Sequence, residues 1–107
     1  MEYDIKRGWF KNIDGDLLEV MMGDVFGNVK KEGDVLVSSY GVLERIEVKV
    51  LSKDKLDITT ANRDGQMDDK AILDSKRKLN TFAEKATGFD AKARMKRAQK
   101  KAKEGKL

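Results

Sequence analysis

Hydrophobic residues recur with two different periods along the chain, and each period predicts one kind of element. In EYDIKRGWF (residues 2–10) they alternate, which predicts a strand with Tyr3, Ile5 and Trp9 on one side. In NIDGDLLEVMMGDVFG they recur every three or four residues, which predicts a helix. We expect Leu18, Met22, Val25 and Phe26 on its buried face, widened by Leu17 and Met21.

This first helix also carries signals for its two ends. Asp14 has the side chain of an N-cap, and Asp16 suits the positive end of the helix dipole. Gly27 can adopt the left-handed conformation in which helices commonly stop.

The segment from Val35 to Ala61 predicts a meander of three strands. Its middle strand alternates, so one face is expected to carry Val42, Ile46, Val48 and Val50 and the other Arg45, Glu47 and Lys49. SKDK forms the next turn, after which Leu56, Ile58 and Thr60 continue the buried side. Gly41 suits a tight connection or a bulge.

Two further helices are predicted after the polar loop NRDGQMDD. The second spans about residues 68–87, begins at Asp68 or Asp69 and ends at Gly88. Its expected core stripe holds Ile72, Leu79, Phe82, Ala83 and Ala86. Asp90 is suited to cap a third helix over about residues 91–104.

The predicted order is β-α-β-β-β-α-α, which indicates an α+β domain (residues 1–89) with a basic helical extension (residues 90–107). An antiparallel sheet of about four strands, with the first two helices on one face, would bury every apolar stripe. This order resembles one half of the TATA-binding-protein fold and, more distantly, the helix-grip folds. The resemblance concerns element order alone and implies nothing about function.

GWFKNIDGDLLEVM and SSYGVLERIEVKV resemble a family of small uncharacterised archaeal proteins, over most of residues 2–87. A family without an assigned function implies no mechanism for this chain.

Composition narrows the chemistry. The 107 residues include no Cys, His or Pro, so the common nucleophile–base pairs and thiolate metal sites cannot be built. No phosphate-binding, dinucleotide-binding or zinc-protease motif occurs. SSYG fits a strand end better than an active site built on hydroxyl groups. TANRDGQMDD fits a turn better than a calcium-binding loop, because Ala71 falls at the position where such a loop needs a bidentate Glu. We expect a protein that is not an enzyme and has no cofactor and no metal.

The start of the chain lacks the apolar core of a signal peptide. The most apolar window, LLEVMM, is far shorter than the roughly 20 residues that span a bilayer. These features favour a cytoplasmic protein that does not enter membranes.

Positive charge is concentrated at the end of the chain. Residues 1–89 hold 15 Lys/Arg and 17 Asp/Glu, a net charge of −2, whereas residues 90–107 hold 8 Lys/Arg and 2 Asp/Glu, a net charge of +6. Helical spacing puts Ala91, Met95, Ala98 and Ala102 on one narrow seam, so we expect a frayed helix that either docks loosely through this seam or becomes ordered only with a partner. The remaining surface holds Lys92, Arg94, Lys96, Arg97, Lys100, Lys101 and Lys103.

Several interpretations of the basic helix stay open. The pattern favours first a solvated helix that only aids solubility, and second contacts to RNA or DNA phosphates without base reading, since the tail has no aromatic residue. The alanine seam could instead pack on a protein partner, and it is too small for membrane insertion. A separate hypothesis is a protein- or small-ligand-binding module that uses the sheet–helix surface near Leu17, Met21 and Met22.

Overall fold

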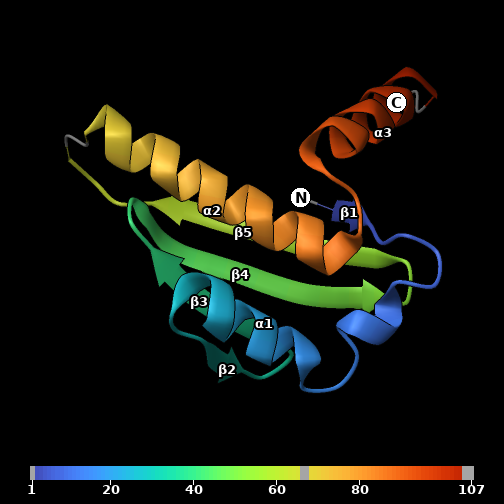
Figure 1. Cartoon of the computed structure of the whole chain (residues 1–107), viewed down its shortest axis with the longest axis horizontal. Helices are drawn as coiled ribbons and strands as arrows, with labels where there is room; N and C mark the ends of the chain where they lie inside the picture. Colours follow the sequence, from blue (N-terminus) through green and yellow to red (C-terminus); the bar gives the residue numbers. More distant parts are fainter. Residues whose placement is uncertain (1, 66–67, 105–107) are drawn as a thin grey trace.

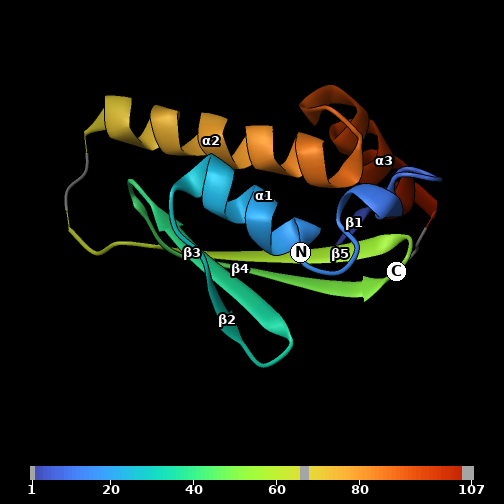
Figure 2. The same ribbon diagram turned by 60° about the horizontal axis from the view of Figure 1, so that its bottom comes forward.

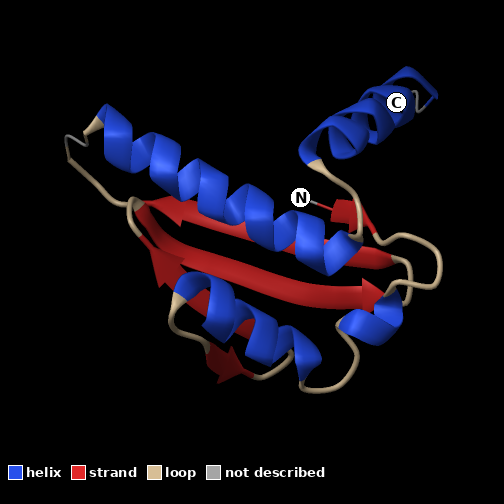
Figure 3. Ribbon diagram, viewed as in Figure 1, coloured by secondary structure: helices blue, strands red, loops and turns tan. Residues whose placement is uncertain are grey.

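The computed structural model describes residues 2–65 and 68–104, without the side chains of Ala98 and residues 101–104. The fold has two layers, one of helices and one formed by the sheet (Figures 1 and 3). The strands are β1 (Glu2–Asp4), β2 (Lys30–Glu32), β3 (Val35–Tyr40), β4 (Leu43–Ser52) and β5 (Lys55–Asn62). The helices are the short 3-10 turn η1 (Phe10–Asn12), α1 (Leu17–Phe26), α2 (Asp69–Thr87) and α3 (Ala91–Glu104).

The sheet is antiparallel throughout and has the order β1-β5-β4-β3-β2. The α+β class is confirmed, with five strands in the described residues instead of about four. The additional strand is β2, whose three charged residues are all exposed. It carries no apolar alternation, and it is a strand because it pairs with residues 35–37 of β3.

One face of the sheet is covered by α1 and α2, as the apolar stripes predict (Figure 2). Met22 of α1, Ile46 of β4 and Phe82 of α2 are fully buried where these three elements meet. The rings of Phe26 and Phe82 join the two helices at a centroid distance of 5.3 Å. The other predicted members of the α1 stripe, Leu18 and Val25, are also buried.

The helix ends follow the sequence signals in most cases. Gly27 and Gly88 both take the left-handed conformation, with φ of 83° and 81°. Asp68 caps α2 by accepting a hydrogen bond from the backbone of Lys70. Asp14 was expected to cap α1, but its side chain does not do so. Its carbonyl oxygen accepts from the Leu17 amide in a turn before the helix.

The prediction of a strand over residues 2–10 was wrong beyond Asp4, where β1 ends. Gly8 has φ of 80°, and the Trp9 amide donates to the Lys6 carbonyl, so the chain turns back instead of extending. Trp9 therefore leaves the sheet. Its indole Nε1 donates to the Lys85 carbonyl at 2.8 Å, close to the end of α2.

Two positions expected inside are exposed. Leu17 lies in the first turn of α1 and is 49% exposed, because only the side of α1 that carries Leu18 faces the sheet. Thr60 lies near the end of β5, beyond the residues that pair with β1. A hollow of about 510 Å³ under α2 keeps Thr60 accessible.

No helix in the described ranges, 2–65 and 68–104, has both the length and the apolar character needed to cross a bilayer.

Candidate functional site

The basic helix α3 starts from a defined junction. The turn at Gly88 ends α2, and the Asp90 carboxylate then accepts a hydrogen bond from the Ala93 amide at 2.8 Å. The predicted Asp90 cap is therefore confirmed. From this junction α3 runs away from the two-layer body, past the end of the sheet where β1 lies (Figure 1).

Two arginines of α3 hold the helix against the body. Arg94 donates to the Phe89 carbonyl at 2.6 Å and to the Asn80 side-chain oxygen at 3.1 Å, so it ties α3 to α2 and to the junction. Arg97 donates through Nε to the Asp4 carboxylate at 2.8 Å, and its guanidinium lies 4.6 Å from the centre of the Phe89 ring.

The Asp4 carboxylate is shared between two cations. Its second oxygen pairs with Lys55 Nζ at 2.7 Å, and only 11% of the Asp4 side chain is exposed. Because one carboxylate meets Arg97 and Lys55, this group of three side chains keeps a net charge of +1.

The described lysines of α3 lie on a different side of the helix. Lys92, Lys96 and Lys100 are exposed. At about 100° per residue, Lys96 and Lys100 lie about 40° and 80° from Lys92, whereas Arg97 and Arg94 lie about 140° and 200° from it. Arg97 therefore borders this row of lysines, about 60° from Lys100, and Arg94 lies on the far side of the helix. The side chains of Lys101 and Lys103, also candidates from the sequence, lie outside the described part of the structure. We call Lys92, Lys96 and Lys100 the lysine face.

The described residues of the alanine–methionine seam, Ala91 and Met95, do not form the docking surface. Met95 is 62% exposed and Ala91 is also exposed, whereas Ala93 and Arg94 are half-buried. Hydrogen bonds and the ring contact made by the arginines replace the weak apolar contact that alanine methyl groups would provide. The other two seam positions, 98 and 102, have no described side chains.

A cleft of about 590 Å³ lies between α3, α2 and the β1 edge of the sheet. Its apolar wall includes Tyr3, Ile58, Leu79, Ala83, Phe89 and Met95. Its polar residues are Glu2, Asp4, Asn80, Arg94 and Arg97, so the charges of the lining balance. We call this space the α2–α3 cleft.

The cleft is not the surface that sequence reasoning favoured for a ligand. Met22 is fully buried in the core, and neither Leu17 nor Met21 lines the α2–α3 cleft. Tyr3 and Phe89 were missed as site residues, because they stand near opposite ends of the sequence and only the fold brings them together. Phe89, a bulky apolar residue next to the cap Asp90 of the basic helix, was the one local signal.

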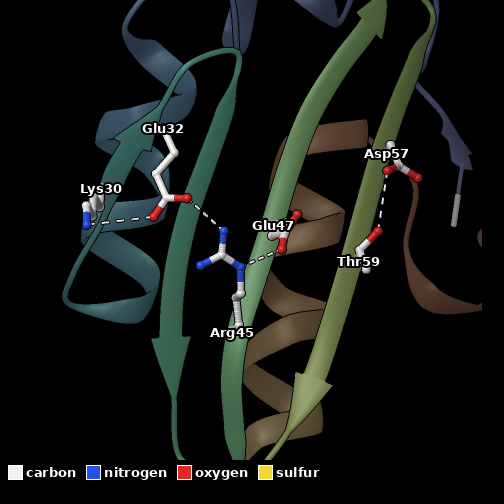
Figure 4. Close-up of polar contacts among 6 residues, drawn as sticks. All are labelled: Lys30, Glu32, Arg45, Glu47, Asp57 and Thr59. Carbon is white, nitrogen blue, oxygen red and sulfur yellow. Dashed lines mark hydrogen bonds and ion pairs between the residues drawn. The ribbon is translucent and has the colours of Figure 1, made fainter.

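The second face of the sheet carries no helix (Figure 2), and it is a mixed-charge surface, as predicted for β4 (Figure 4). Arg45 pairs with Glu32 of β2 at 2.8 Å and also with Glu47, and Glu32 lies 3.8 Å from Lys30. The hydrogen bond from Arg45 holds the pKa of Glu32 below its usual range. This surface lacks the basic or aromatic rows of a sheet that binds DNA.

Within residues 2–65 and 68–104, no three acidic side chains gather in the arrangement of a metal site. The loop compared with a calcium site is described only in part, since residues 66 and 67 lie outside the described ranges. Its described end, Asp68, serves as the cap of α2.

Comparison with known proteins places the chain in a family. Residues 1–100 match the domain of unknown function DUF5611. The chain belongs to this family. The match includes β1, the Gly88 junction and most of α3, so the DUF5611 region contains both anchoring arginines and the lysine face.

Among solved structures, the chain is similar to the NMR solution structure of hypothetical protein TA0095 from Thermoplasma acidophilum. The two share 31% sequence identity with a TM-score of 0.60, over 91% of this chain and 95% of that one. This likeness agrees with the resemblance to small uncharacterised archaeal proteins. No curated protein matches the chain.

Proposed function

We propose that this DUF5611 protein is a non-enzymatic nucleic-acid-binding protein that contacts the sugar–phosphate backbone through the lysine face of α3. The observation that carries the proposal is the two-sided arrangement of α3. Arg94 and Arg97 are bound to the body, while Lys92, Lys96 and Lys100 are exposed on another side of the same helix. Four-residue spacing sets these lysines about 6 Å apart along the helix axis.

The position of the charge also supports this function. On the open face of the sheet, Arg45 is paired with Glu32 and Glu47, and Lys30 with Glu32. Among the described side chains, no carboxylate forms an ion pair with the lysine face, and α3 extends away from the slightly acidic body (Figure 1). Exposed lysines in one row attract phosphates through counterion release, which gives affinity without sequence readout.

The test measures binding of the full chain to a fluorescein-labelled 20-nucleotide strand by anisotropy, between 50 and 200 mM salt. We expect affinity to fall steeply with salt. The triple variant K92Q/K96Q/K100Q should bind much more weakly, with a log–log salt slope shallower by about 2, from about 0.7 per phosphate contact on a single strand.

The control is K11Q/K31Q/K53Q, which removes three exposed lysines from the body and changes the net charge equally. It should keep nearly all of the affinity. Absence of binding at 50 mM salt, or equal losses in the two triple variants, would overturn the proposal.

A further inference from the structure

The α2–α3 cleft lies beside the lysine face. Met95 connects the two surfaces, because it lines the cleft and stands about 60° around the helix from Lys92, at about 100° per residue. A nucleic-acid strand bound along the lysine face therefore passes the mouth of the cleft. A duplex cannot use this space, since its bases are paired and stacked inside the helix.

The cleft has the features of a pocket for one flat, mostly apolar group. Its volume of about 590 Å³ falls within the range of small-molecule pockets, and most of its lining is apolar. Two aromatic residues, Tyr3 and Phe89, take part in the lining. The basic tail lacks an aromatic residue of its own, so the fold adds the stacking groups that the tail sequence does not have.

Polar groups for the edge of a base are present as well. The Asn80 side-chain oxygen is occupied by Arg94, which leaves the Asn80 amide N–H groups to donate to a bound molecule. The guanidinium of Arg97 already lies against the Phe89 ring, an arrangement that also suits stacking with a base. These few groups would give a weak preference among bases.

Resting on the proposed backbone binding, we infer that the nucleic acid is single-stranded and that one unpaired base enters the α2–α3 cleft. Phosphates lie along Lys92 and Lys96, and the base reaches past Met95 to stack on Tyr3 or Phe89. Charge complementarity binds the nucleic-acid strand to α3, and the aromatic lining of the cleft adds a base-dependent contribution to the affinity.

The experiment compares three labelled probes with the full chain at 50 mM salt: a dT12 strand, a 12-unit abasic strand with the same phosphates, and a 12-base-pair duplex. We expect dT12 to bind at least about fivefold more tightly than the abasic strand, the lower end for one base stacked on an aromatic side chain. It should also bind more tightly than the duplex.

Two variants locate the base. Y3L and F89L keep an apolar side chain but remove the ring, so each should bring the ratio of dT12 affinity to abasic-strand affinity toward one. F89L also loses the ring contact to Arg97, so the ratio of the two affinities is compared and not the absolute affinity. Circular dichroism checks that each variant is folded, because the basic tail can bind the abasic strand by charge alone. The control F10L removes a half-buried aromatic ring outside the cleft and should keep the difference between the strands.

A measurement on the unmodified protein is independent of variant folding. In NMR spectra, dT12 should shift the signals of Tyr3, Phe89 and Met95, and the abasic strand should shift mainly those of the lysine face. Equal, salt-sensitive affinity for dT12 and the abasic strand overturns this inference and leaves the proposed function standing. No binding of any probe overturns both, and a preference for the duplex overturns the single-strand assignment alone.

Discussion

The hydroxyl of Ser75 occupies the space that a side chain at Gly41 would need. Ser75 is fully buried on α2; its Oγ donates to the Ala71 carbonyl at 2.8 Å and accepts from the Val42 amide at 3.0 Å. A Cβ atom at Gly41, where φ is +54°, would lie 2.2 Å from that oxygen. The turn between β3 and β4 and the helix above it are therefore built around each other.

G41A should lower the free energy of unfolding by about 2–5 kcal/mol, the sum of left-handed strain and overlap with Ser75. The control G33A changes a glycine with φ of +62° and no atom within 4 Å of the new Cβ. Its free energy of unfolding should therefore fall only by the cost of the left-handed strain, about 1–2 kcal/mol. Urea unfolding followed by circular dichroism measures both.

The overlap is tested further in the background of S75A. That variant removes the hydroxyl and by itself costs about 1–3 kcal/mol, because the Val42 amide loses its partner. In S75A the cost of G41A should fall to that of G33A. An unchanged cost would show that Ser75 is not what excludes a side chain at position 41.

G88A should both destabilise the protein and change the emission of Trp9, the single tryptophan. A Cβ at Gly88 would lie 2.7 Å from the Trp9 ring, so the ring must move and lose its hydrogen bond to Lys85. The matched control is G27A, at another helix end with nearly the same φ and free space around the new atom. Equal stability losses and identical emission spectra in the two variants would contradict this account.

Acid should weaken the open face of the sheet through Glu32. Because the Arg45 hydrogen bond lowers the folded-state pKa of this carboxyl, its contribution to stability is present above the unfolded pKa and is lost as pH falls through the folded value. E32Q removes that contribution. The stabilities of the wild type and E32Q should therefore differ at pH 7 and approach each other below about pH 4, the range of a free Glu.

The control for the acid effect is E44Q, which removes an exposed carboxylate elsewhere on β4. Chemical denaturation at a series of pH values measures all three proteins. A constant difference between the wild type and E32Q down to low pH would contradict the Arg45–Glu32 assignment.

D4N should loosen α3 without unfolding the body. The substitution replaces the charged partner of Arg97 with a neutral one, while the contacts of Arg94 remain. Because Arg97 is half-exposed, the loss is small, and hydrogen exchange of α3 amides should become about two- to fivefold faster. The control K55M removes the other cation at Asp4 and should leave α3 exchange nearly unchanged. Faster α3 exchange in K55M but not in D4N would show that Lys55, and not the Asp4–Arg97 pair, holds α3 in place.

The sequence predicts the elements whose signals are local. Gly27 and Gly88 end their helices, Asp68 and Asp90 cap the next ones, and the alternation of β4 continues in the folded sheet. It does not predict β2, because Lys30 and its neighbours become a strand only through pairing with β3. Trp9 left its expected strand because Gly8 turns the chain, and alternation alone does not show that turn.

The candidate site was predictable only in its charge. The run of Lys and Arg in residues 92–103 is evident from the sequence, but the division into anchoring arginines and exposed lysines is not. It depends on Asp4, which meets Arg97 across 93 positions of the chain. The same long-range contact brings the segments of Tyr3 and Phe89 into the lining of one cleft, which neither segment encodes alone.

The lengths of the two outermost strands have a consequence for the behaviour of the protein at high concentration. β1 and β2 each contain three residues, and charged side chains fill most of their positions. Short, charged strands offer a poor template for another chain to extend the sheet. The two edges of the sheet are thereby protected against pairing with a second molecule. This protection allows the protein to stay dispersed although the second face of its sheet is in solvent.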